Sequence, residues 1–221
     1  MSLWIKICAN TSLEDALLAV DAGADAVGFV FAPSPRQVAA DQVAAIVPGL
    51  PRSIEKIGVF VDVSADEIAA AVRACGLTGV QLHSDAEADA PAQLRAEFGP
   101  GLRILRVVHF GVDAAGLAAI YAEDPNVDAV LVDSRTATAV GGTGIAFDWN
   151  EARRTVFADG RARMVAAGGL TPENVAEAIR TLRPWGVDVA SGVEAAPGKK
   201  DPAKVRAFVE RAREAESNPR G

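Results

Sequence analysis

The chain of 221 residues contains few of the side chains that metal sites and disulfide frameworks require. Its two cysteines, Cys8 and Cys75, are too far apart in the sequence to indicate a disulfide framework. It has two histidines, His83 and His109, and no closely spaced set of Cys and His residues that would indicate zinc. We therefore expect no metal site and a reducing compartment.

Long apolar stretches and an excess of positive charge are missing as well. No apolar run approaches the roughly 20 residues that a membrane helix needs, and no secretory signal precedes the first run. The net charge is −7, which argues against nucleic acids and anionic membranes as partners, because both attract basic surfaces. The sequence therefore predicts a cytoplasmic protein with no membrane and no nucleic-acid partner.

The chain does contain a regular alternation of two kinds of segment. Stretches rich in Ala, Leu, Glu and Arg have helical spacing, and some carry helix start signals. These are capping boxes at 11–14, 64–67 and 84–87, and a capping side chain before proline at Thr171-Pro172 and Asp201-Pro202. Between these stretches lie eight short apolar runs that read as strands. They are "WIKIC", "AVGFVF", "EKIGVFVD", "GVQLH", "RILRVV", "AVLVD", "RMVAAGG" and "GVDVASG".

Strands that alternate with helices pair in parallel, because parallel neighbours need crossover connections. Eight such units in a chain of this length match a closed (β/α)8 barrel. The main competitor, an open doubly wound sheet, usually has fewer strands and a glycine fingerprint after the first one, whereas "CANTS" contains no glycine. We predict one TIM-barrel domain over residues 1–221, with the active site at the C-terminal ends of the strands and a polar frayed tail from about residue 214.

Several polar residues fall on the expected strands, some of them at the strand ends. They are Lys6, Cys8, Gln81, His83, Arg106, Asp133 and Asp188. Side chains alternate between the two faces of a strand, so Lys6 shares a face with Cys8, and Gln81 shares one with His83. A barrel interior is normally filled by branched apolar residues. This set therefore indicates a site at the C-terminal mouth of the barrel.

Each of these residues also has a structural interpretation, which the sequence leaves open. Cys8 can be a small core residue, which is the commoner fate of a free cysteine. Asp133 can cap the turn that follows its strand, and His83 can be a buried histidine or the cap of the next helix. Lys6 and Asp188 can simply neutralise neighbouring charges.

Glycine clusters follow the last three strands: "GGTG" at 141–144, "AGGL" and "ASGVE". Glycine lets the backbone approach a ligand closely, and barrels of this fold often bind a phosphate with the loops after strands seven and eight. A phosphorylated small molecule is the substrate this pattern predicts, and the candidate phosphate-binding residues are Gly168, Gly169, Ser191 and Gly192. Arg36, in "FAPSPRQV", either grips a carboxylate through a two-pronged contact or is an exposed loop arginine.

The order and spacing of these blocks resemble one known family from Lys6 to about Phe208. "KIC" followed by "TSLEDA", "GADAVGFVF.PSPR", "VQLH", "VLVDS", "GGTG..FDW", "AGGLTPENVAEAI" and "VDVASGVE..PGKKD" are similar to phosphoribosylanthranilate isomerase. The resemblance implies a cofactor-free Amadori rearrangement in tryptophan biosynthesis. In it, N-(5-phosphoribosyl)anthranilate becomes 1-(2-carboxyphenylamino)-1-deoxyribulose 5-phosphate. It also leaves room for association with other enzymes of that pathway.

The resemblance also implies roles for individual residues. Cys8 falls on the general base and Asp133 on the general acid. The acid and the base must begin in opposite protonation states, so we expect Lys6 to favour a thiolate at Cys8 and partial burial to favour a protonated Asp133. The substrate-binding residues that it implies are Arg36 for the anthranilate carboxylate and Asp188 near the ribose. His83 is a further substrate-binding candidate, from its place on the fourth strand. The phosphate loops fall on Gly168, Gly169, Ser191 and Gly192.

Two positions depart from the family pattern, in which glycine usually follows the cysteine and the "QLH" motif. Here those positions hold Ala9 and Ser84. If the first position needs a positive φ, Ala9 is strained there, unless the loop has re-formed with Asn10.

Other functions remain open at this stage. A sugar-phosphate epimerase or lyase would require metal-binding histidines or paired carboxylates, and His109 is expected to lie beyond its strand. Isomerisation of histidine-pathway aminoaldoses would call for phosphate loops on both sides of the barrel. A non-catalytic binder of phosphorylated ligands would have no need of both Cys8 and Asp133.

Overall fold

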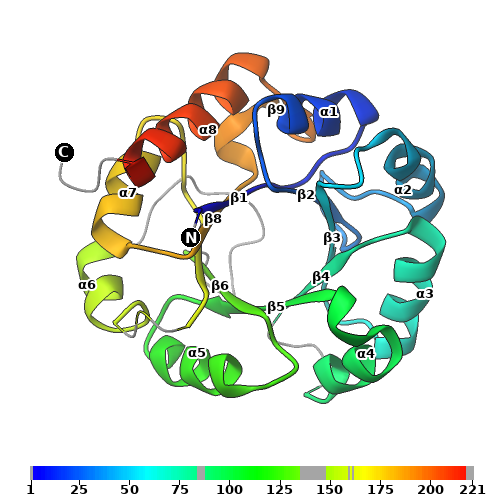
Figure 1. Cartoon of the computed structure of the whole chain (residues 1–221), viewed down its shortest axis with the longest axis horizontal. Coiled ribbons are helices and arrows are strands. Elements are labelled where there is room, and N and C mark those ends of the chain that lie inside the picture. The colour runs from blue at the N-terminus through cyan, green and yellow to red at the C-terminus, as the bar shows by residue number, and fades with distance from the viewer. Residues whose placement is uncertain (1, 84–87, 135–147, 159, 161, 218–221) are drawn as a thin grey trace.

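A closed barrel of eight parallel strands forms the centre of the protein, which confirms the predicted fold (Figure 1). The computed structural model describes residues 2–83, 88–134, 148–158, 160 and 162–217. Each strand pairs with its neighbours in the chain, and the first pairs with the last to close the ring. The strands are β1 (Trp4–Ile7), β2 (Ala26–Val30), β3 (Glu55–Phe60), β4 (Gly79–Leu82), β5 (Arg103–His109), β6 (Ala129–Asp133), β7 (Met164–Ala167) and β8 (Gly186–Val189).

Helices follow the strands and surround the barrel (Figure 1). They are α1 (Leu13–Asp21), α2 (Ala40–Ile46), α3 (Ala65–Cys75), α4 (Ala90–Phe98), α5 (Ala114–Glu123), α6 (Trp149–Arg154), α7 (Val175–Leu182) and α8 (Pro202–Ser217). Short 3-10 turns lie at η1 (Val47–Gly49), η2 (Gly99–Gly101) and η3 (Ser191–Val193). Helix α8 continues to Ser217, past the position near 214 at which we expected the tail to begin.

Of the five helix start signals, two hold, and the one at 84–87 lies outside the described residues. Ser64 and Glu67 form the expected capping box of α3, and the Asp201 carboxylate accepts from the first backbone N–H groups of α8. The prediction at Thr171-Pro172 is wrong, because α7 begins only at Val175. The prediction at α1 is wrong by one residue, because Ser12 caps that helix. The Thr11 hydroxyl donates instead to the carbonyl of Gly198, 2.6 Å away, and is thus committed to another part of the chain.

Two apolar layers pack on the two faces of the barrel wall. The outer layer lies between the strands and the helices, and the inner layer fills the barrel itself. Along each strand, alternate residues point inward, as they must in a pleated sheet. The buried inner residues are Trp4, Ala26, Ile57, Leu105, Val107, Ala129, Leu131, Val165 and Ala167.

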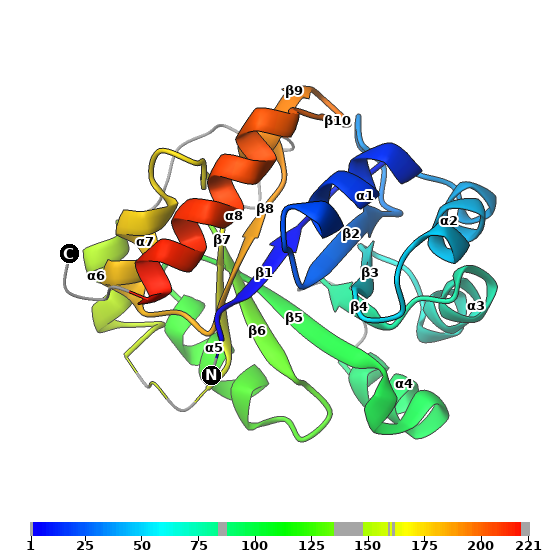
Figure 2. The same ribbon diagram turned by 45° about the horizontal axis from the view of Figure 1, so that its top comes forward.

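A small antiparallel hairpin follows the eighth strand, and nothing in the sequence predicted it. It consists of β9 (Glu194–Ala196) and β10 (Lys199–Lys200). Figure 2 shows this hairpin at the end of the barrel opposite the N-terminus, close to α1. It therefore stands at the end where the strands finish, above the barrel mouth.

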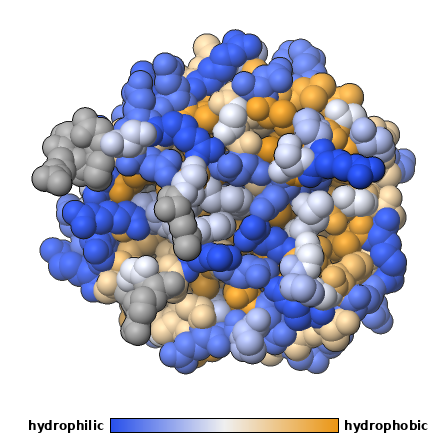
Figure 3. Space-filling model, in the orientation of Figure 1, coloured by the Kyte–Doolittle hydropathy of each residue, from blue (hydrophilic) through white to orange (hydrophobic). Residues whose placement is uncertain are grey.

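The outside of the molecule is largely polar on the face that Figure 3 shows, with hydrophobic residues in smaller groups between hydrophilic ones. Among the described residues, none of the helices is long and apolar enough to cross a membrane.

Candidate active site

A buried polar cluster lies inside the barrel on three strands. Lys6 of β1 is fully buried, and its Nζ donates to Oε1 of Gln81 at 2.8 Å and to Oδ1 of Asp188 at 3.0 Å. Burial lowers the pKa of Lys6, but the charges of Asp188 and Cys8 and their hydrogen bonds outweigh it, so the pKa is raised. Lys6 is therefore a fixed positive charge within the barrel.

Cys8 follows β1 directly and points into the barrel above Lys6. Its backbone N–H donates to the carbonyl of Val189 at 2.8 Å, which ties it to the end of β8, and its side chain is buried. Gly28 of β2 makes room for the thiol: a methyl group there would lie 2.6 Å from Cys8 Sγ and 3.0 Å from Lys6 Cε. The position of the thiol thus depends on a glycine that sequence reasoning did not single out.

The thiol differs from our expectation in its protonation. We expected Lys6 to favour a thiolate, and Lys6 does lower the pKa of Cys8. Burial raises it by more, however, with the charge of Asp188 adding to that, so the pKa of Cys8 lies above its ordinary value of about 9.0. The resting site therefore holds Cys8 chiefly as a thiol at neutral pH.

The residue after the thiol adopts the conformation that the family's glycine would favour. Ala9 is buried with φ of 62°, in the left-handed region. The loop has kept this shape rather than re-forming. Asn10 fixes it, because its backbone N–H and its Nδ2 both donate to the carbonyl of Gly28, at 2.9 and 3.2 Å, and Nδ2 also donates to Ile7 O at 2.8 Å.

Asp133 ends β6 on the same inward-facing set of positions as Leu131, and it is buried. Its carboxylate lies against the backbone of Gly168, where a methyl group would come within 2.5 Å of Oδ1. In the register of the sheet, Asp133 faces His109 of β5 on one side and Ala167 of β7 on the other. The predicted acid therefore borders the predicted phosphate loop.

The two histidines lie together at the mouth, with their ring centres 5.7 Å apart. His109 is the last residue of β5, so the expectation that it lies beyond its strand is wrong. The prediction that Arg106 belongs to the polar set at the barrel mouth is also wrong. It points outward to α5, where its Nη2 donates to the Tyr121 hydroxyl at 2.8 Å and its guanidinium stacks on that ring.

The loops after β7 and β8 pack against each other through backbone atoms. Gly168 and Gly169 have φ of 80° and 66°, which favour glycine. Gly192, in η3, leaves no room for a side chain because the carbonyl of Leu170 lies directly against it. Ser191 begins the same turn. The "GGTG" cluster at 141–144 and Ser84 lie outside the described residues.

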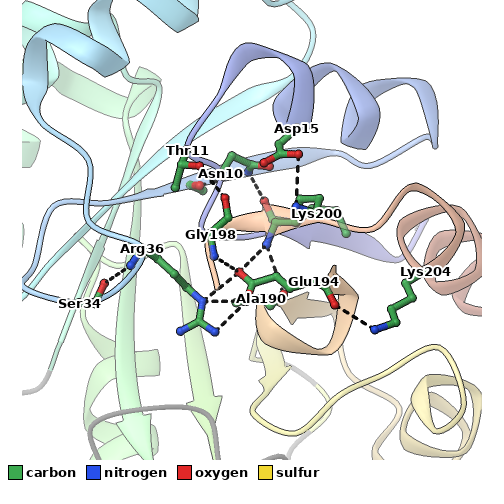
Figure 4. A network of polar contacts seen from close by, with 12 residues as sticks. Asn10, Thr11, Asp15, Ser34, Arg36, Ala190, Glu194, Gly198, Lys200 and Lys204 are labelled. Carbon is green, nitrogen blue, oxygen red and sulfur yellow. Dashed lines mark hydrogen bonds and ion pairs between the residues drawn. The ribbon is translucent and has the colours of Figure 1, made fainter. Parts of the chain in front are cut away.

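Arg36 makes a two-pronged contact, but with the protein's own Glu194 of β9. Its Nε lies 2.9 and 3.0 Å from the two carboxylate oxygens, and its Nη2 lies 2.7 Å from Oε2 (Figure 4). Lys200 of β10 is also buried beside Glu194, 3.4 Å from Oε1. Sequence reasoning missed both residues, although they lie in the "VE..PGKKD" block.

The site has no group of His, Cys, Asp and Glu side chains, in the part of the chain described, that could hold a metal ion. Its chemistry is that of a buried thiol, a buried carboxylate and glycine-rich loops at the mouth of a barrel. These features define the class as a (β/α)8-barrel enzyme that works by proton transfer on an anionic small molecule.

Comparison with known proteins gives the family within that class. The family model described as N-(5'phosphoribosyl)anthranilate (PRA) isomerase matches residues 5–211. The N-(5'-phosphoribosyl)anthranilate isomerase of Pelobacter propionicus is 45% identical over 214 residues, covering 96% of this chain and 97% of its own. The chain belongs to the phosphoribosylanthranilate isomerase family.

Solved structures agree with that assignment. The phosphoribosyl anthranilate isomerase of Thermotoga maritima superimposes with a TM-score of 0.83 at 37% identity, covering 96% of this chain and 99% of its own. A second isomerase, with a TM-score of 0.79 at 35% identity, covers 96% of this chain and 99% of its own. That structure is a complex with reduced 1-(o-carboxyphenylamino)-1-deoxyribulose 5-phosphate.

Proposed function

We propose that this chain carries out the isomerisation of its family on N-(5'-phosphoribosyl)anthranilate, in tryptophan biosynthesis, with Cys8 as the general base and Asp133 as the general acid. The observation that carries this assignment is the placement of the two groups. Both are buried, inward-facing residues at the C-terminal ends of barrel strands, where enzymes of this fold position their chemistry. Family membership supplies the reaction.

The reaction needs two proton transfers that suit these groups. Asp133 donates a proton to the furanose ring oxygen as the bond from that oxygen to C1′ breaks, which gives a Schiff base. The Cys8 thiolate then takes the proton from C2′, and the resulting enolamine tautomerises to the ketone product. Each positioned proton transfer is typically worth about 10²–10⁴-fold in rate.

The reactive form of Cys8 is the minor one in the resting protein, because burial raises the pKa of the thiol. The cations around it limit that effect. Lys6 lies directly below the thiol, and the charges of Lys6 and Lys200 both lower the pKa of Cys8. We assign these two lysines the role of keeping the thiolate accessible to catalysis.

The remaining assignments concern binding. The loops after β7 and β8, with Gly168, Gly169, Ser191 and Gly192, offer backbone N–H groups to the phosphate. We assign the anthranilate carboxylate to Arg36, and the ribose to Asp188, with His83 lining the same mouth. Association with other enzymes of the pathway, a cytoplasmic location and a single domain over residues 1–221 stay predictions.

The test follows the loss of anthranilate fluorescence as freshly generated N-(5'-phosphoribosyl)anthranilate is consumed. We expect Cys8→Ser and Asp133→Asn each to lower kcat by about 10²–10⁴-fold while binding of the reduced product analogue is largely kept. Cys75→Ser is the matched control, since Cys75 is also a buried thiol but ends helix α3 and does not belong to the barrel strands. Near-normal turnover by either site variant would overturn the role of that residue.

A further inference from the structure

The guanidinium of Arg36 is held by one edge. An arginine has two edges that can each make a parallel pair of hydrogen bonds: a side edge formed by Nε and Nη2, and an end edge formed by Nη1 and Nη2. Glu194 occupies the side edge, at 2.7–3.0 Å (Figure 4). The hydrogen bonds that Arg36 donates to Glu194 are the main reason why the pKa of Arg36 is raised.

The end edge is left for another partner. Within the described residues, Nη1 of Arg36 has no hydrogen bond. The Arg36 side chain is 17% exposed, so a ligand can reach the guanidinium. Arg36 is also close enough to the barrel mouth for the charge of Cys8 to affect its pKa. The end edge is therefore the part of the guanidinium that remains available to a carboxylate bound at the mouth.

Glu194 is itself fixed from several sides, although it belongs to a hairpin outside the barrel. Its side chain is only 4% exposed to solvent. Oε1 accepts from the backbone N–H of Gly198 at 3.3 Å and lies 3.4 Å from Lys200 Nζ, and the Glu194 carbonyl accepts from Lys204 at 2.9 Å. Burial favours the protonated acid, but the hydrogen bond from Arg36 and the charge of Lys200 outweigh it and lower the pKa of Glu194.

The hairpin is anchored in turn to the first helix. The hydroxyl of Thr11 donates to Gly198 O at 2.6 Å, and the backbone N–H of Lys200 donates to Asp15 Oδ1 at 3.3 Å. Lys200 Nζ also donates to the carbonyl of Ala190, at the end of β8 (Figure 4). The carboxylate of Glu194 is therefore a preorganised group, whose own position does not depend on Arg36 alone.

We infer that Glu194 is a positioning residue for substrate specificity: it holds the side edge of Arg36, so that the end edge is presented to the carboxylate on the aromatic amine of the substrate. This inference rests on the proposed function and adds to it. Selectivity for an amine that carries an ortho carboxylate then depends on two residues far apart in the sequence, Arg36 in the loop after β2 and Glu194 in β9.

The test is a pair of ligands that differ only in that carboxylate. One is reduced 1-(o-carboxyphenylamino)-1-deoxyribulose 5-phosphate, and the other is its counterpart made from aniline. The dissociation constant of each ligand is measured by calorimetry. We expect Glu194→Gln to raise it about 10- to 100-fold for the carboxylated ligand and to change it less than about 2-fold for the aniline ligand. Glutamine keeps one acceptor oxygen but turns an NH₂ group towards the guanidinium, so Arg36 swings from its position.

The matched control is a second two-pronged pair at the other end of the barrel. Glu55, at the start of β3, accepts from Arg103 Nε and Nη2 at 2.7 Å each. Glu55→Gln breaks a pair of the same geometry, and we expect both ligands to bind it as they bind the wild type. When Glu194→Gln is added to Arg36→Lys, the affinity for the carboxylated ligand should fall by no more than a further factor of about 2. Both residues act through the same contact, that of Arg36 with the ligand carboxylate, so their effects do not add.

The outcomes separate this inference from the proposed function. Equal weakening of both ligands by Glu194→Gln, or no weakening of either, would overturn the inference while leaving the function intact. Failure of the wild type to bind the carboxylated ligand would count against the function itself. If Glu194→Gln does not fold, Glu194→Asp replaces it: the charge beside Lys200 is kept, but the carboxylate is withdrawn from Arg36, and the same selective loss is expected.

Discussion

The two ends of the barrel interior are built from the same strands but from opposite kinds of residue. Just above the bottom opening of the barrel, where Glu55 pairs with Arg103, the inward positions are apolar, as at Trp4, Ile57 and Leu105. Further along β1, the next inward positions hold Lys6 and Cys8. Four other strands, β4, β5, β6 and β8, carry polar groups towards the mouth, namely Gln81, His109, Asp133 and Asp188. We call the apolar residues just above the bottom opening the lower layer and the polar residues near the strand ends the upper layer. The lower layer stabilises the fold by burying apolar surface, and the upper layer places charges where they are costly to bury.

This contrast teaches where the stability of the chain is at risk. An apolar layer loses stability when its packing is changed, by atoms removed or added, whereas a buried charge loses its compensation when its partner is changed. The same holds for two ion pairs at the two ends of the barrel. The Arg103–Glu55 pair lies partly exposed where the strands start, and the Arg36–Glu194 pair is more deeply buried past the strand ends. Breaking the upper layer should therefore cost more than breaking exposed pairs.

The largest effect on folding is expected from Asp188→Asn. This change leaves the Lys6 ammonium buried without its anion, and we expect the free energy of unfolding to fall by about 3–5 kcal/mol in urea denaturation. The matched acid-to-amide control is Glu97→Gln, which removes the exposed partner of Arg73 and should cost less than about 1 kcal/mol. Similar losses in the two variants would show that burial does not distinguish the pairs.

Gly28→Ala should damage catalysis more than folding. The added methyl group would lie 2.6 Å from Cys8 Sγ, so the thiol must move, and we expect kcat to fall about 10²-fold. Gly101→Ala serves as control, because a methyl group there meets nothing within 4 Å. An unchanged kcat in Gly28→Ala would mean that the position of the thiol is not important for turnover.

A smaller effect concerns the titration of the thiol. In a Cys75→Ser background, the ultraviolet absorbance of the Cys8 thiolate should appear with a midpoint above pH 9.0, because burial raises the pKa of Cys8. A raised pKa means that the folded protein binds the proton more tightly than the unfolded chain. Its contribution to stability is therefore complete below about pH 9 and is lost as the pH rises through the folded-state value.

The matching stability measurement uses Cys8→Ala in the same background. As the pH rises past 9, the free energy of unfolding should fall more steeply in the protein that keeps Cys8 than in Cys8→Ala. A thiolate midpoint well below 9.0 would mean that Lys6 and Lys200 outweigh burial, in which case the upper layer would be better solvated than its geometry indicates.

Much of this arrangement could be predicted from the sequence, because both periodicities are local. The alternation of strands and helices gave the barrel, and the side-chain period of two gave the shared face of Lys6 and Cys8. The direction of Arg106 was predicted wrongly. The segment "RILRVVH" has apolar residues on both faces of its strand, so the sequence does not show which face points into the barrel. The inward residues of β5 are Leu105 and Val107, with His109 at the end.

The pairing of Arg36 with Glu194 could not be predicted in this way. The two residues are 158 positions apart, and their contact depends on a hairpin that is too short to give a periodic signal. The net protonation of Cys8 was equally out of reach, because it is the difference between burial and nearby charges. Both terms depend on three-dimensional distances rather than on residue types.

The smallest effect is expected from Ala9→Gly, the one substitution that should improve the upper layer. Ala9 has φ of 62°, a conformation that costs an alanine about 1–2 kcal/mol, while glycine loses about 0.5–1 kcal/mol more backbone entropy on folding. We expect the free energy of unfolding to rise by about 0.5–1 kcal/mol, with kcat unchanged, because the hydrogen bonds of Asn10 still hold the loop. Ala22→Gly, where φ is −74°, should lower stability instead. If both changes lowered it alike, the strain at Ala9 would already be relieved by its surroundings, and the departure from the family's glycine would cost the fold nothing.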